Sequence, residues 1–244
     1  MMPGARTAAW AKSGGGVPTA RDYVQNGLIA MWDGIENAGW GVHNPNAMVR
    51  KDLVGNCDCE VYTGNPSWDE KCFIGDRSTF FAGKSQLIGN AIVSNSFTLE
   101  MFIDYRKVPV SIDSKMQQGQ FGVFNSLSNS NTNRIFNPMW NWVNSFYTTY
   151  RGAETDHGSF SQKSRQCYFK GDGSCRILGV DKSMNRSNSI GDDYFVTLGA
   201  FGIPLGIKYS TYSKIYAIRL YNKIITDKDL SDNYAVDKAR FNLP

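Results

Sequence analysis

Hydrophobic and polar residues alternate over much of this chain with the period of two that is typical of β-strands. The clearest case is residues 97–104, where every odd-numbered position is apolar and the even-numbered face carries two acids. An Asp-Gly pair at 172–173 stands between two apolar runs and predicts a hairpin turn. Further strands are predicted over residues 27–34, 120–127, 146–150, 165–170, 175–180, 194–200 and 214–222.

Residues 225–240 depart from the strand pattern and predict one short helix. Thr226 is the expected N-cap, because Asp229 follows three residues later as the acidic partner of a capping box. Leu230 and Tyr234 lie one turn apart, so both are expected to dock on the strands. The pattern therefore predicts an all-β fold with a single helix near the end of the chain.

The first 22 residues lack periodicity and contain three consecutive glycines, at 14–16, which predicts a flexible leader over residues 1–22. Residues 23–244 are then expected to form one sandwich domain. The leader has no continuous apolar segment of the kind found in signal peptides. No segment reaches the roughly 18–20 apolar residues of a membrane span. We therefore expect an extracellular or virion-associated location, reached as part of a larger assembly or by lysis.

The chain has 244 residues and a formal charge of +4, with Lys and Arg distributed among acids along its whole length. No basic stripe is visible, so nucleic acid is not an expected partner. The spacing of Cys57 and Cys59, together with the presence of only two histidines, disfavours a zinc site. Cys167 and Cys175 flank the predicted hairpin, so a disulfide between them stays open beside the favoured interpretation of free, buried thiols.

The order of these elements resembles a known family. An opening GLIAMWDG strand at 27–34 is followed by DLVGN at 52–56 and FFAG at 80–83. The most specific match is KIYAIRLYN at 214–222 with the helix after it. This order resembles the laminin-G-like domains of the concanavalin A-like lectin/glucanase superfamily over roughly residues 24–241. The resemblance implies a jelly-roll sandwich of two antiparallel sheets, whereas Val54 and Ala82 depart from the family pattern.

The closing strand supports the same fold without the family. Ile215, Ala217, Arg219 and Tyr221 are expected on one face, and Tyr216, Ile218, Leu220 and Asn222 on the other. Both faces are largely apolar, as expected for a strand that is covered on two sides. The fold alone does not fix the function, because this superfamily includes lectins, adhesion domains, structural spacers and hydrolases.

Catalytic carboxylates are not expected. Glucanases of this superfamily resemble one another in an E-x-D-x-x-E strand, and retaining enzymes need a carboxyl pair about 5–5.5 Å apart. The nearest candidates here, Glu100 and Asp104, are four residues apart, which is roughly 13 Å along an extended strand. His43 and His157 lie in loop-like segments without a nucleophile motif. The sequence therefore predicts a protein that is not an enzyme.

Calcium stays open as a ligand, because laminin-G-like folds often bind one Ca²⁺ ion through loop oxygens. No dense run of acids identifies a loop site, and no metal ligand is assigned. The available carboxylates are Asp156, Asp172, Asp181, Asp192 and Asp193.

Two aromatic, amide-rich stretches have the composition of a glycan site. Aromatic faces pack on sugar C–H surfaces, and amides bond to hydroxyl groups. The candidates in the first stretch are Trp40, His43 and Asn44, and those in the second are Trp140, Trp142 and Tyr150. The competing interpretation is packing, with Trp40 as a lid over a sheet edge and the Trp140–Trp142 pair in the core. The pattern slightly favours packing for both.

The function expected from the sequence is non-catalytic recognition or adhesion, with a cell-surface or extracellular glycan as the ligand. The alternative is a structural, decoration, fibre or tail-associated protein of a phage particle. In that case the sandwich would contact other virion or surface proteins.

Overall fold

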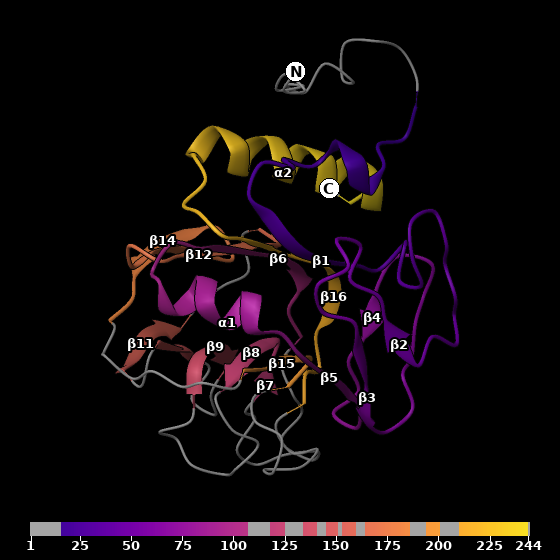
Figure 1. The fold of residues 1–244 in the computed structure, drawn as a ribbon, viewed down its shortest axis with the longest axis horizontal. Coiled ribbons are helices and arrows are strands. Elements are labelled where there is room, and N and C mark those ends of the chain that lie inside the picture. Colours follow the sequence, from indigo (N-terminus) through magenta and orange to yellow (C-terminus); the bar gives the residue numbers. More distant parts are fainter. Residues whose placement is uncertain are drawn as a thin grey trace.

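The computed structural model describes residues 16–106, 118–124, 134–140, 145–150, 153–159, 164–185, 194–200 and 210–243. Within these residues two antiparallel sheets pack face to face, which confirms the predicted all-β sandwich (Figure 1). The first sheet has seven described strands in the order β1-β16-β6-β12-β13-β14, and β4 pairs with β16. Their bounds are β1 Leu28–Asp33, β4 Phe73–Ile74, β6 Thr98–Asp104, β12 Gln166–Lys170, β13 Ser174–Ile177, β14 Val180–Ser183 and β16 Lys214–Tyr221.

The second sheet has nine described strands in the order β11-β10-β9-β8-β15-β5-β3-β2, and β7 pairs with β9. Their bounds are β2 Val49–Arg50, β3 Cys59–Thr63, β5 Phe80–Lys84, β7 Gln118–Gly119, β8 Phe121–Phe124, β9 Arg134–Trp140, β10 Ser145–Tyr150, β11 Ala153–Ser159 and β15 Phe195–Leu198. The predicted hairpin at 172–173 is confirmed, because it joins β12 to β13.

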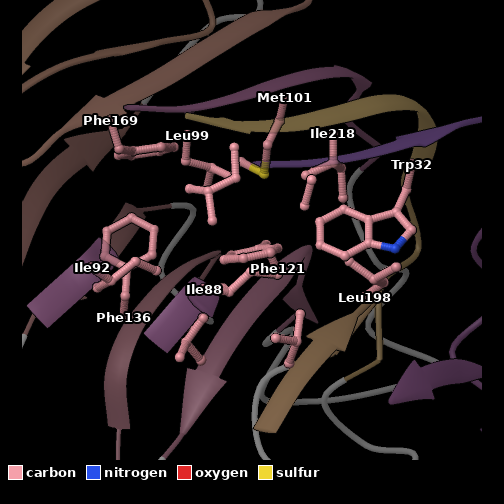
Figure 2. Close-up of a cluster of buried hydrophobic side chains, with 14 of the residues drawn as sticks. Trp32, Ile88, Ile92, Leu99, Met101, Phe121, Phe136, Phe169, Leu198 and Ile218 are labelled. Atoms are coloured by element: carbon pink, nitrogen blue, oxygen red, sulfur yellow. The ribbon is translucent and has the colours of Figure 1, made fainter. Parts of the chain in front are cut away.

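The main core lies between the two sheets (Figure 2). Trp32, Leu99 and Ile218 enter it from the seven-stranded sheet, and Phe121 and Phe136 enter it from the opposite sheet. The Trp32 and Phe121 rings meet across the interface with centroids 6.1 Å apart. The predicted alternation of residues 97–104 is confirmed, since the odd-numbered face of this strand belongs to the core.

A helix that the sequence pattern did not predict, α1 (Gln86–Val93), closes one side of this core. Ser85 caps it by accepting a hydrogen bond from the Ile88 N–H group. Ile88 and Ile92 lie one turn apart and both are buried against the sheets (Figure 2). Eight residues are too few for a clear helical period, so the sequence pattern does not predict this helix.

The predicted C-terminal helix is confirmed as α2 (Asp227–Phe241). Thr226 and Asp229 form the expected capping box, and the helix lies across the outer face of the seven-stranded sheet (Figure 1). Leu230 is buried with Tyr221 and Ile225, which confirms its predicted docking.

The predicted faces of the closing strand are wrong at its start. The pairing register of β16 with β6 shifts between Ile215 and Ala217, as in a β-bulge. Ile215 therefore faces the inter-sheet core together with Ile218 and Leu220, whereas Tyr216 and Ala217 both pack in the cluster that includes Phe241 of α2. A bulge leaves no distinct signal in a period-two pattern.

A buried ionic network joins α2 to the sheet. Arg219 donates two hydrogen bonds of 2.7 Å to Asp237 and one of 3.2 Å to Glu100. Arg240 binds Asp33 at 2.6 Å. Burial raises the pKa of Glu100, and the positive charge of Arg219 opposes that shift. Glu100 is therefore a structural partner of Arg219, facing away from the inter-sheet core.

The end of the predicted leader is folded. Ala20–Asp22 form the 3-10 helix η2, and Ala20 is buried. The adjacent Tyr23 hydroxyl donates to Asp237 at 2.7 Å. The boundary at residue 22 is therefore placed several residues too late, while residues 1–15 lie outside the described part of the chain.

All five cysteines are free and buried, so Cys167 and Cys175 form no disulfide. In the register of β12 with β13, Cys175 pairs with Phe169, which places the two sulfur-bearing residues in different cross-strand pairs. No helix of the described residues is long and apolar enough to cross a membrane.

Candidate functional site

An open depression of about 350 Å³ lies on the outer face of the nine-stranded sheet, over β3, β5 and β15. We call it the Tyr62 groove. Its lining residues are Asp58, Glu60, Tyr62, Ala82, Gly83, Lys84 and Phe195. The side chains that face outward are those of Asp58, Glu60, Tyr62, Ala82, Lys84 and Phe195, because the alternate residues Val61, Phe81 and Val196 pack on the core.

The groove is hollow because its centre is built from small residues. Ala82 is paired with Glu60 on one side and with Thr197 on the other. The neighbouring Gly83 contributes only backbone to the floor, because a Cβ atom at this position would point inward to Cys57 and Cys59. The longer side chains of Tyr62, Lys84 and Phe195 therefore stand around a low floor.

Tyr62 supplies an aromatic surface. Its side chain is 52% exposed, and its ring is stacked on Phe80 with centroids 5.1 Å apart and an interplanar angle of 23°. Phe80 is fully buried and holds the Tyr62 ring from one side. Such a braced, half-exposed ring offers contact area at little cost in side-chain entropy.

The charged groups of the groove differ in whether other residues already bind them. Asp58 is paired with Lys51 at 2.5 Å and accepts a hydrogen bond of 3.0 Å from the Asp52 N–H group. The Lys84 ammonium lies 4.6 Å from the centre of the Phe195 ring. Within the described chain, no hydrogen bond or ion pair engages the Glu60 carboxylate. Glu60 is thus the acceptor available to a ligand.

The predicted site around Trp40 is only partly suited to binding. Trp40 is 37% exposed at a loop tip, and the Arg21 guanidinium lies 4.4 Å from the centre of its ring. His43 Nδ1 lies 3.1 Å from the Ile35 carbonyl oxygen. The Asn44 backbone exchanges two hydrogen bonds of 2.8 Å with the Asn37 side chain. His43 and the Asn44 backbone therefore hold the loop, while Trp40 and Asn44 are exposed.

The prediction that Tyr150 binds a ligand is wrong. The residue is fully buried, and its hydroxyl donates to Asn95 Oδ1 at 2.5 Å. It lies on the inward face of β10, edge-on to the rings of Phe97 and Phe136. The alternation of β10 determines this, because Phe146 and Tyr150 share the face that packs on the core.

The interpretation of the second aromatic stretch stays a prediction. The backbone of Trp140 ends β9, where it pairs with Phe146 of β10 and with Gln118 of β7. The Trp140 side chain and the whole of Trp142 lie outside the described residues.

In the described ranges, no group of three or more His, Cys, Asp or Glu side chains is arranged to hold a metal ion. Two of the calcium candidates have other partners: Asp172 accepts hydrogen bonds from Ser174, and Asp181 pairs with Arg176 at 2.7 Å. Asp192 and Asp193 lie outside the described residues.

The sequence matches no protein-family model and no curated protein. Solved structures do match. Trypanosoma rangeli sialidase in complex with sialic acid aligns with a TM-score of 0.59 at 14% identity, over 92% of this chain and 34% of the sialidase chain. A protein described as a receptor binding domain aligns with a TM-score of 0.54 at 15% identity, over 86% of this chain and 51% of its own.

At such identities the similarity shows the β-sandwich fold alone. The chain spans about a third of the sialidase and about half of the receptor binding domain. The narrower laminin-G-like assignment stays a prediction.

Sequence reasoning missed the Tyr62 groove. The signal was the segment Cys-Glu-Val-Tyr-Thr at 59–63, in which buried and exposed positions alternate. That signal predicts a strand with an outward Tyr62. It does not predict that small residues of β5 would lie beside that ring.

Proposed function

We propose that this domain is a non-catalytic recognition module that binds carbohydrate in the Tyr62 groove. The observation that carries the proposal is the exposed Tyr62 ring, braced by Phe80, beside the unengaged Glu60 carboxylate. A pyranose presents an apolar C–H face and a rim of hydroxyl groups. The ring would pack on that face while Glu60 accepts from two hydroxyls.

The groove suits a short saccharide. Its volume of about 350 Å³ is near the lower end of the roughly 300–1,000 Å³ typical of ligand sites. Lys84 adds a donor for hydroxyl or carboxylate oxygens at the far side of the floor. Because one solved neighbour is a sialidase in complex with sialic acid, acidic sugars belong among the first ligands to test.

The positions of the carboxylates support binding without hydrolysis, because the lining residues of the groove do not offer the two unengaged acids that a glycosidase uses. Glycosidases place two acids on opposite sides of the scissile bond. In the groove Asp58 is committed to Lys51, which leaves Glu60 as the single unengaged acid. Glu100, the acid that the sequence singles out, is buried against Arg219. A surface glycan would make the chain an adhesion module at a cell or particle surface.

A glycan array followed by calorimetry tests the proposal. We expect Tyr62→Ala and Glu60→Gln each to weaken binding of the best glycan at least tenfold, without release of reducing ends by the wild type. Trp40→Ala is the matched control, because it removes an exposed aromatic residue outside the groove.

Two outcomes would contradict the groove. If Trp40→Ala abolishes binding and Tyr62→Ala leaves it intact, the loop around Trp40 is the site. If the wild type binds no glycan at all, the alternative of a structural protein–protein module gains support.

A further inference from the structure

Two thiols lie side by side directly beneath the Tyr62 groove. Cys57 and Cys59 are separated by one residue, and their sulfur atoms are 3.9 Å apart. Both side chains are buried in the inter-sheet core, while Asp58 between them faces the groove. The sulfurs belong to free thiols, so the pair retains both potential thiolate ligands.

A buried guanidinium faces this pair. Arg50 is directly opposite Cys59 in the ladder of β2 with β3, and its side chain is fully buried. None of its three guanidinium nitrogens has a hydrogen-bond acceptor among the described residues. The carboxylate that acts on its charge, that of Asp33, is already bound by Arg240.

Such an arrangement is costly unless an anion is added. A buried charge without a partner is strongly destabilising, and buried charges in proteins are normally paired. The Trp68 ring, 5.6 Å from the Arg50 guanidinium carbon, offers only a weak cation–π contact. The charge of Arg50 therefore points to an anionic group beside Cys59.

We propose that Cys57 and Cys59 bind one monovalent, thiophilic metal ion of the Cu(I) class. Two thiolates and one Cu⁺ ion carry a net charge of −1, and the guanidinium of Arg50 carries +1. The buried unit is then neutral. Binding replaces two S–H bonds by two S–Cu bonds and releases two protons to solvent, with no change of oxidation state.

The ligand set selects this class of ion. Zn²⁺ takes four ligands, and the described residues place no third His, Cys, Asp or Glu side chain at the pair. Cys72, another buried thiol, is already engaged, because it donates to Asp69 at 3.2 Å. Soft thiolates favour Cu(I), and this ion accepts two ligands.

The distance is also suitable. With metal–sulfur bonds of about 2.3 Å, the two sulfurs of a linear site would be about 4.6 Å apart. The sulfur atoms at 3.9 Å therefore need to separate by less than one bond length.

Gly83 keeps the space beside the sulfurs open. A Cβ atom at this position would lie 3.0 Å from Cys57 Sγ and 3.1 Å from Cys59 Sγ, and 2.6 Å from the Asp58 carbonyl oxygen. Gly83 also lines the floor of the groove. The glycine thus lies between the groove and the thiols without filling the site.

Titration with Cu(I) under anaerobic conditions, in competition with a chromophoric Cu(I) chelator, tests the proposal. We expect one ion per wild-type chain and an affinity at least 100-fold lower for Cys57→Ala/Cys59→Ala. The matched control is Cys167→Ala/Cys175→Ala, which also removes two buried thiols and is expected to stay within about threefold of the wild type. Circular dichroism melting establishes that each variant is folded.

Two further variants keep both thiols. Arg50→Met is expected to weaken Cu(I) binding at least tenfold while the metal-free protein melts at or above the wild-type temperature. A purely structural Arg50 would instead lower that melting temperature. Gly83→Ala is expected to lose Cu(I) binding, because its methyl group fills the space beside the sulfurs.

The proposal is overturned if the Cys57→Ala/Cys59→Ala protein still binds one Cu(I) ion with wild-type affinity. It is equally overturned if the Cys167→Ala/Cys175→Ala control loses binding to the same extent. Should the first variant fail to fold, unchanged Cu(I) affinity in both Arg50→Met and Gly83→Ala would be decisive against it.

Discussion

Replacing Asp237 by alanine should destabilise this fold strongly. The Asp237 carboxylate accepts hydrogen bonds of 2.7 Å from both terminal nitrogens of Arg219, and both side chains are buried. Removing one partner of a buried pair costs about 3–5 kcal/mol, because the other charge is left uncompensated. Glu100, 3.2 Å from Arg219, moderates this loss, so we expect about 3 kcal/mol. For a chain of this size that is a decrease in melting temperature of roughly 6–12 °C.

Helix α2 provides a matched control. Lys228 and Asp232 form an exposed ion pair one turn apart, with side chains 64% and 27% exposed. Exposed pairs of this kind contribute about 0.3–0.5 kcal/mol, so Asp232→Ala should lower the melting temperature by about 1–2 °C. Urea denaturation and thermal melting of both variants measure the difference. If Asp237→Ala costs no more than Asp232→Ala, the ionic network does not hold α2 to the sheet.

Two more predictions concern buried groups. Burial and then the charge of Lys182 lower the pKa of His157 to about 4, below the value of about 6.5 in an unfolded chain. The unfolded state therefore binds the extra proton first, and stability is lost as the pH falls from about 6.5 to 4. His157→Gln should flatten this part of the urea-measured stability profile; a profile that keeps the wild-type slope would count against the assignment. Gly89→Ala should destabilise α1 by about 1–3 kcal/mol through overpacking, because its Cβ atom would lie 1.9 Å from the Tyr194 ring. Helix propensity alone predicts a gain of about 1 kcal/mol, so increased stability in thermal melting would refute the contact.

The parts of the fold that the sequence predicted share a strong local signal. Residues 97–104 alternate without interruption, and the helix after Thr226 begins with a capping box. Both signals depend on residues close in sequence, for which the spacing alone predicts the local structure. Helix α1 was not predicted because its two large buried residues, Ile88 and Ile92, provide only a single turn of helical period.

The candidate site could not be predicted in the same way. Glu60 and Ala82 are neighbours only because β3 pairs with β5 in one register, and that register is a long-range property. Tyr150 was misplaced for the related reason that an aromatic residue on a strand belongs to one of two faces. Composition does not show whether Tyr150 lies on the inward or the outward face of its strand, whereas its packing against Phe97 places it on the inward face.

The residues that carried the family resemblance and those that carry the proposed function lie on different surfaces. Arg219 stands in the most specific part of the resemblance, yet it is buried and binds Asp237 under α2. Its contacts hold the helix to the sheet, and they do so whatever ligand the domain binds. Tyr62 and Glu60 occupy outward positions. At such positions packing places little constraint on the residue type, so the residue can be suited to a ligand. In this sandwich, mutations that test function should therefore be made at outward strand positions beside small residues such as Ala82. A motif match in the closing strand indicates the fold and does not identify the ligand.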